Sequence, residues 1–78
     1  MQTIYVVETY KNSDGEIWPE RAVICRNDQD AIRRARMFSE DAAGVVAYSQ
    51  EVNPDACECS APVVLAQYGA VPLGSRVM

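Results

Sequence analysis

The side chains best suited to metal or covalent chemistry in this sequence are its three cysteines, Cys25, Cys57 and Cys59. Cys57 and Cys59 form a C-x-C pair, which could offer two thiolates to a soft metal ion or act as a redox pair. A closed zinc site needs four nitrogen or sulfur ligands, and the chain has no histidine to help complete one. We therefore interpret Cys57 and Cys59 as ordinary loop thiols, with a Cys-based metal or redox protein as an alternative.

Cys25 is the candidate nucleophile, because it comes directly before Arg26 and a predicted helix N-terminus. It also alternates with Val23 in a strand pattern, which favours a small buried side chain instead. Without histidine, acid–base chemistry would depend on carboxylates, tyrosines, cysteines or Lys11, and the four glycines are scattered rather than gathered in a phosphate loop. The sequence thus predicts a protein that is not an enzyme and that uses no cofactor and no metal.

The charged side chains are divided unevenly along the chain, whose formal net charge is −4. Residues 1–36 carry six basic and six acidic groups, whereas residues 37–75 contain no lysine or arginine. The resulting acidic surface repels nucleic-acid phosphates and favours a protein partner with a basic surface. The alternative is that the acids only keep a small protein soluble. The acids proposed to contact the partner are Glu40, Asp41, Glu51, Asp55 and Glu58.

Three arginines, Arg33, Arg34 and Arg36, form a small basic patch on the predicted helix. Aromatic side chains of a sheet could stack bases beside such a patch. Three charges are few for a nucleic-acid site, and Asp30 precedes Arg34 by four residues, the spacing of an ion pair along a helix. We therefore expect a solvated, ion-paired helix face and no direct contact with nucleic acid.

Clear turn signals separate the elements that must position these groups. Residues 3–10 are rich in β-branched and aromatic side chains, which predicts a strand. Asp14-Gly15 is a strong hairpin turn. A second strand is expected only after Pro19, over residues 20–26, because proline cannot donate to a strand ladder. Residues 45–52 and 63–68 predict two further strands, joined by a loop over residues 53–60.

The clearest pattern in the chain is a helix after Asn27, the predicted N-cap, with Asp28 and Asp30 in the first turn. Gly44 is expected at the C′ position, where it would end the helix. Apolar residues recur between them at helical spacing and predict one buried stripe. These residues are Ala31, Ile32, Ala35, Phe38 and Ala42.

The element order β-β-α-β-β predicts an α+β fold: a single four-stranded, largely antiparallel sheet with one helix packed on one face. We expect one domain over residues 1–72 and a flexible C-terminal tail over residues 73–78. The other sheet face would have no helix over it, so strand aromatics could make it a contact surface. Among these aromatics, Tyr48 and Tyr68 are the proposed anchors of a partner.

The apolar stretches of the sequence are far shorter than the ~20 residues of a membrane-spanning helix. The N-terminus shows no basic region followed by a long apolar one, as a secretory signal would. These patterns predict a cytoplasmic protein without membrane contact.

Residues 27–72 resemble small uncharacterised bacterial proteins of β-β-α-β-β type. The likeness is carried by the helical run at residues 30–36, by Gly44-Val45-Val46-Ala47-Tyr48-Ser49, by Val63-Val64-Leu65-Ala66 and by Gly69-Ala70-Val71-Pro72. The resemblance implies the fold and brings no reaction or ligand with it, and Cys57-Glu58-Cys59 departs from the pattern. By size and acidity alone, the chain is also similar to phage-encoded inhibitors of the anti-CRISPR kind, many of which present acids to a basic nucleic-acid channel.

Taken together, these observations predict a protein-binding module that works by stoichiometric association. It would be a small acidic inhibitor or modulator of a nucleic-acid-handling protein complex. A structural homodimer, formed by pairing of sheet faces or of edge strands, is the alternative.

Overall fold

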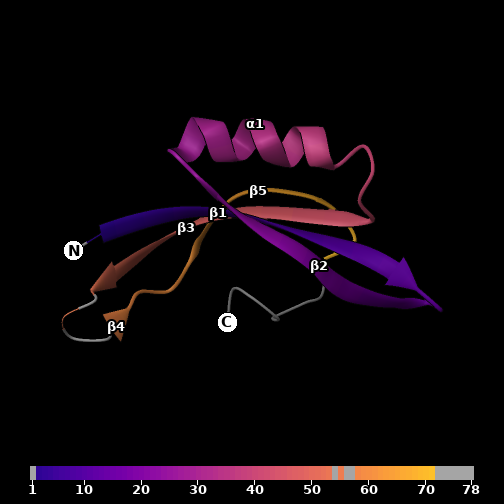
Figure 1. Ribbon diagram of the computed structural model, residues 1–78, viewed down its shortest axis with the longest axis horizontal. Coiled ribbons are helices and arrows are strands. Elements are labelled where there is room, and N and C mark those ends of the chain that lie inside the picture. Colours follow the sequence, from indigo (N-terminus) through magenta and orange to yellow (C-terminus); the bar gives the residue numbers. More distant parts are fainter. Residues whose placement is uncertain (1, 54, 56–57, 72–78) are drawn as a thin grey trace.

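The computed structural model describes residues 2–53, 55 and 58–71, which form an antiparallel sheet with an α-helix across one of its faces (Figure 1). The strands are β1 (Gln2–Ser13), β2 (Glu16–Cys25), β3 (Gly44–Asn53), β4 (Glu58–Cys59) and β5 (Val63–Gly69), and the helix is α1 (Asp28–Phe38). The α+β fold predicted from the sequence is thereby confirmed.

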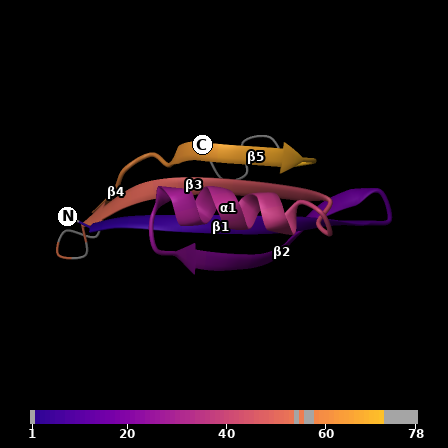
Figure 2. The same cartoon turned by 90° about the horizontal axis from the view of Figure 1, so that it is seen from above.

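The strands follow the order β2-β1-β3, and both β4 and β5 pair with the remaining edge of β3 (Figure 2). Because β1 occupies the other edge of β3 from Gly44 to Val52, β4 and β5 lie one after the other along the same edge. The sheet is therefore four strands wide. The sequence did not predict β4, because a strand of two residues shows no periodicity.

A two-residue turn joins β1 to β2, with φ of 54° at Asp14 and 82° at Gly15. These left-handed values are those that a tight hairpin turn requires, as the Asp-Gly pair predicts. β2 begins earlier than predicted and includes Pro19. The proline is tolerated because β2 is an edge strand and its register with β1 shifts beside the proline, between Thr9 and Tyr10.

α1 begins where the sequence places its N-cap. The side-chain oxygen of Asn27 accepts a hydrogen bond from the backbone N–H of Asp30 at 2.8 Å. Ala31 and Ala35 are fully buried against the sheet, whereas Ile32, predicted in the same stripe, is 38% exposed. The apolar stripe is thus narrower than the sequence predicts.

The segment after the helix differs from the prediction. α1 ends at Phe38 with Ser39 as its C-cap, so Gly44 is not at the C′ position. Gly44 is instead the first residue of β3, where a Cβ would overlap the backbone oxygen of Ala70. Glycine is needed here for close contact between two backbone segments rather than to end a helix.

The core lies between α1 and the sheet. Alternate residues of each strand point to this face, and Tyr5 and Tyr68 pack at its margin. The register places Tyr10 and Tyr48 on the opposite face of the sheet. The buried core residues are Val7, Cys25, Ala31, Ala35, Val45 and Ala47.

Within the described ranges, no helix has the length and apolar character needed to span a membrane. Residues 73–78, expected to form a flexible tail, and Cys57 of the C-x-C pair lie outside the described residues.

Candidate functional site

The acids proposed as partner contacts lie in two groups at opposite ends of β3. Glu40 and Asp41 fall between α1 and β3, whereas Glu51 is near the end of β3 and is followed by Asp55 and Glu58. With its ten residues, β3 spans roughly 30 Å. The two groups therefore do not form one patch. We refer to Glu51, Asp55 and Glu58 as the acidic end.

The acidic end is built on the hairpin that connects β3 to β4. Asn53 pairs with Glu58 across this hairpin, and Asp55 lies in its turn. Ser60 fixes the returning chain by donating its backbone N–H to the carbonyl oxygen of Glu51 at 2.9 Å. The hydroxyl of Ser60 accepts the backbone N–H of Glu51 at 3.1 Å. One short hairpin thus carries all three acids.

Four of the proposed acids are exposed and take part in no ion pair with a described residue. Glu40, Asp41, Glu51 and Asp55 are all exposed, and in the part of the chain that the structure describes both ion pairs belong to Asp30. The charge of these four side chains is therefore available to a basic partner. Such an attraction weakens as salt screens it.

Tyr48 and Tyr68, the proposed aromatic anchors, point to opposite faces of the sheet. Tyr68 packs against the core on the helix side, opposite Val45 in the register. Tyr48 lies on the other face, and its hydroxyl donates to Glu8 Oε2 at 3.2 Å. Both side chains are half-buried. The structure does not bring the two tyrosines together, and neither lies on the hairpin of the acidic end.

The sheet face away from α1 carries a polar cluster that the sequence did not reveal. The hydroxyls of Tyr10 and Tyr48 donate to the two carboxylate oxygens of Glu8 at 2.9 and 3.2 Å. Tyr10 and Val46 beside this cluster are each 1% exposed. Strand alternation could have placed Glu8 and Tyr10 on one face. To place Tyr48 in the same cluster, one must know the register of β1 with β3, and no local sequence pattern contains that register.

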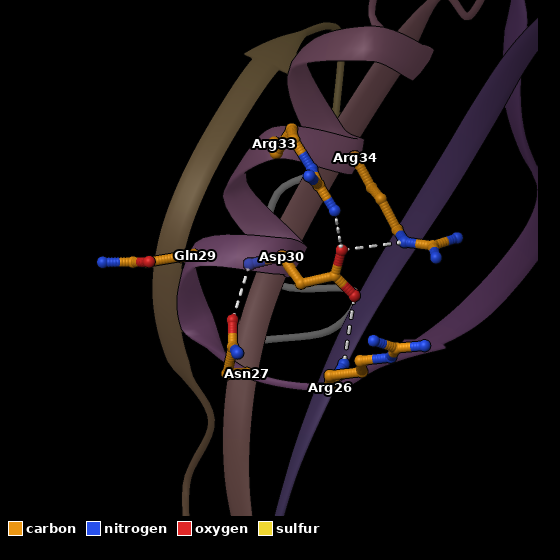
Figure 3. Close-up of a pocket in the computed structure, with 6 residues that line it drawn as sticks. All are labelled: Arg26, Asn27, Gln29, Asp30, Arg33 and Arg34. Carbon is orange, nitrogen blue, oxygen red and sulfur yellow. Dashed lines mark hydrogen bonds and ion pairs between the residues drawn. The ribbon is translucent and has the colours of Figure 1, made fainter.

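A second charged site surrounds Asp30 at the start of α1 (Figure 3). Arg33 Nη2 and Arg34 Nε donate to Asp30 Oδ1 at 2.7 and 3.2 Å. The backbone N–H of Arg26 donates to Oδ2 at 3.1 Å. A pocket of about 460 Å³ opens beside them, and its lining residues are Arg26, Asn27, Gln29, Asp30, Arg33 and Arg34.

These contacts keep Asp30 ionised although its side chain is only 7% exposed. The backbone hydrogen bond from Arg26 and the guanidinium of Arg33 lower the pKa of Asp30 to about 2, against the opposing effect of burial. The spacing of the sequence predicted the pair with Arg34, and this pair is confirmed. The contact with Arg26 was not predicted, because it depends on how the end of β2 approaches the helix. The cluster ties α1 to the residue that follows β2.

Cys25 is a core residue. Burial and the nearby carboxylate of Asp30 raise the pKa of its thiol, more than Arg34 lowers it. Because the thiolate is the nucleophilic form, a raised pKa makes this thiol a poor nucleophile at neutral pH. The interpretation of Cys25 as a small buried side chain is therefore the one that the structure supports.

No group of three or more acidic, cysteine or histidine side chains among the described residues is placed to hold a metal ion. Of the C-x-C pair, the backbone of Cys59 pairs with Val52 in β4, whereas Cys57 lies outside the described residues. A metal or redox role for this pair stays a prediction.

The fold and these sites define a small α+β domain with one helix across an antiparallel sheet. No protein-family model, curated protein or solved structure matches the chain. The resemblances noted from the sequence therefore stay predictions. The argument for function comes from the side chains of this protein.

Proposed function

We propose that this protein is a non-enzymatic protein-binding module whose acidic end contacts a partner with a basic surface. The observation that carries the proposal is the gathering of Glu51, Asp55 and Glu58 on one hairpin. Glu51 and Asp55 are exposed and form no ion pair with any described residue. A fixed hairpin with several acids presents a strong local field of one sign.

The electrostatics favour a protein partner over nucleic acid. An acidic surface repels phosphates, whereas complementary charge speeds the encounter with a basic protein and sets the orientation of the complex. Proteins that handle nucleic acids carry basic surfaces of this kind. We infer that the chain inhibits or modulates such a protein by occupying its basic surface in a stoichiometric complex.

We assign the proposed contact to one end of the molecule. Glu40 and Asp41 lie at the other end of β3, so a single compact surface does not reach both groups. Tyr48 and Tyr68 are engaged on opposite sheet faces. We therefore assign the proposed contact to the acidic end, and the distant acids serve as its control.

Capture experiments with two matched variants test this proposal. Each variant loses three negative charges, so both have the same net charge and differ only in where the charge is removed. The acidic-end variant carries Glu51→Gln, Asp55→Asn and Glu58→Gln. The control variant carries Glu16→Gln, Glu40→Gln and Asp41→Asn.

The full-length chain and both variants are immobilised and exposed to a lysate of the host cells, and circular dichroism verifies that each is folded. We expect the native chain and the control variant to retain one basic protein, released by salt, that the acidic-end variant does not retain. Equal retention by all three proteins, or retention of none, would contradict the proposal.

A further inference from the structure

β5 is an outer strand of the sheet and carries no charge. Within the described part of the chain, it pairs only with β3. Its seven residues, VVLAQYG, include neither a proline nor a charged side chain. Outer strands of monomeric proteins are commonly protected by charges, prolines or bulges, since their outward N–H and C=O groups recruit other strands. β5 has one register shift, opposite Ala47 and Tyr48, and lacks the other protections.

The opposite outer strand, β2, has these protections. Pro19 removes a backbone donor, the register shifts beside it, and charged residues precede and follow it. These charged residues are Glu16, Glu20 and Arg21. Among the described residues, the sheet thus has one open edge and one protected edge, which favours a closed pair of molecules over an extended fibre.

The outward backbone groups of β5 follow from one hydrogen bond. The N–H of Ala70 donates to the carbonyl oxygen of Ala43 at 2.9 Å, so this N–H points toward the segment that leads into β3. The register runs without a shift from this hydrogen bond to the pair of Val46 with Gln67, and in an antiparallel ladder hydrogen-bonded pairs alternate with pairs whose backbone groups point outward. Gln67 and Gly69 therefore direct their N–H and C=O groups away from β3, toward the outer edge.

Apolar side chains are exposed beside this edge. Val63 is 60% exposed and Val64 is 42% exposed. They pair with Ser49 and Tyr48 of β3, which places them on opposite faces of the sheet. Addition of another strand would remove part of this apolar surface from water on both faces.

We propose that the β5 edge binds a second copy of this chain, with the two β5 strands antiparallel and the two-fold axis beside Gln67. Such a pairing is self-complementary and places Gln67 of one copy opposite Gln67 of the other. Charge favours this occupant and this direction. Each chain has a net charge of −4, but β5 itself is uncharged, so no like charges meet where the two strands pair. Antiparallel pairing also keeps the two acidic ends apart, because it places them on opposite sides of the axis. This dimer leaves the acidic end accessible and does not rest on the proposed function.

Sedimentation equilibrium of the full-length chain over a dilution series tests the proposed dimer. We expect the native chain to form a dimer that dissociates on dilution. Gln67→Lys should weaken the dimer by about tenfold or more, because two like charges would face each other across the axis. Gln67→Glu should weaken it similarly. An equimolar mixture of the two variants should form a heterodimer, since the opposite charges then face each other.

Ile24→Lys is the matched control, because Ile24 is 67% exposed on the protected strand β2. This variant should dimerise as the native chain does, and circular dichroism verifies the fold of every variant. Four results would overturn the proposal: a monomeric native chain at all concentrations, unweakened dimerisation of Gln67→Lys, a mixture without heterodimers, or loss of the dimer in Ile24→Lys. The last result would place the contact of a second copy away from β5.

Discussion

Gly44 pairs with Gly69 in the register of β3 and β5, and a Cβ on either residue would overlap a backbone oxygen of the neighbouring segment. For Gly44 that oxygen belongs to Ala70, and for Gly69 it belongs to Ala43. Gly69 also has a φ of 69°, in the left-handed region that favours glycine. This pair of glycines sets how closely the end of β5 approaches the start of β3.

Gly44→Ala should therefore destabilise the protein strongly. The methyl group would meet backbone and not a movable side chain, so β5 would have to shift. We expect the free energy of unfolding in urea to fall by about 3 kcal/mol or more, at the upper end of the usual range for overpacking. Gly15→Asn is the control. It lies in the hairpin turn with open space around it, so only its left-handed φ of 82° opposes the substitution, and asparagine is among the residues that adopt such a φ most readily. The loss should therefore be about 1 kcal/mol, well below that of Gly44→Ala. Similar losses in both variants would contradict this account of Gly44.

The N-cap of α1 gives a second prediction. Asn27→Ala removes the side-chain oxygen that accepts the N–H of Asp30, and we expect a loss of about 1 kcal/mol in urea unfolding. Asn27→Asp keeps an acceptor at the same position and should retain most of the stability. If the alanine and aspartate variants are equally stable, the cap does not contribute as described.

Asp30 gives a prediction about acid stability. Its pKa in the folded protein is about 2, below its ordinary value of 3.8, so the folded state binds fewer protons than the unfolded state in this interval. The stabilisation is therefore fully present above the ordinary pKa and is lost as the pH falls toward the folded pKa. We expect Asp30→Asn to be less stable than the native chain at neutral pH, with a flatter decline between about pH 4 and pH 2.

Urea unfolding at several pH values measures this difference. Asp28→Asn is the control, because it removes a carboxylate from the same helical turn and leaves the contacts of Asp30 with the arginines in place. If the free energy of unfolding of Asp30→Asn depends on pH as that of the native chain does, the carboxylate contacts of Asp30 do not stabilise the fold.

Local features of the fold could be predicted from the sequence, and features that depend on distant pairing could not. The N-cap and the Asp-Gly turn each reside in a few adjacent residues, and both lie where predicted. The place of Pro19 within β2 depends on that strand being outermost, and the role of Gly44 depends on a segment 26 residues away in the chain. Neither fact is contained in a local pattern.

The candidate site shows the same division. The sequence identifies the acids, but only the ten-residue length and direction of β3 separate Glu40 and Asp41 from the acidic end. The sequence alone could not show that Tyr48 and Tyr68 point to opposite faces, because this follows from the register that pairs Tyr68 with Val45, three residues before Tyr48 in β3. A one-residue change of register moves a side chain to the other face of a sheet.

The salt dependence of partner binding gives a further prediction. If the acidic end carries the contact, raising the ionic strength should weaken binding of the native chain, because exposed charges are screened. The acidic-end variant should show a smaller salt dependence than the control variant of equal net charge. Equal salt dependence in both would indicate that net charge, and not the acidic end, governs binding.

Calorimetric titration of the purified, captured partner into the native chain and the two matched variants is the most direct test of the acidic end. Our account expects a one-to-one complex with the native chain and with the control variant, and an affinity lower by about tenfold or more for the acidic-end variant. Equal affinities for the two variants would contradict it.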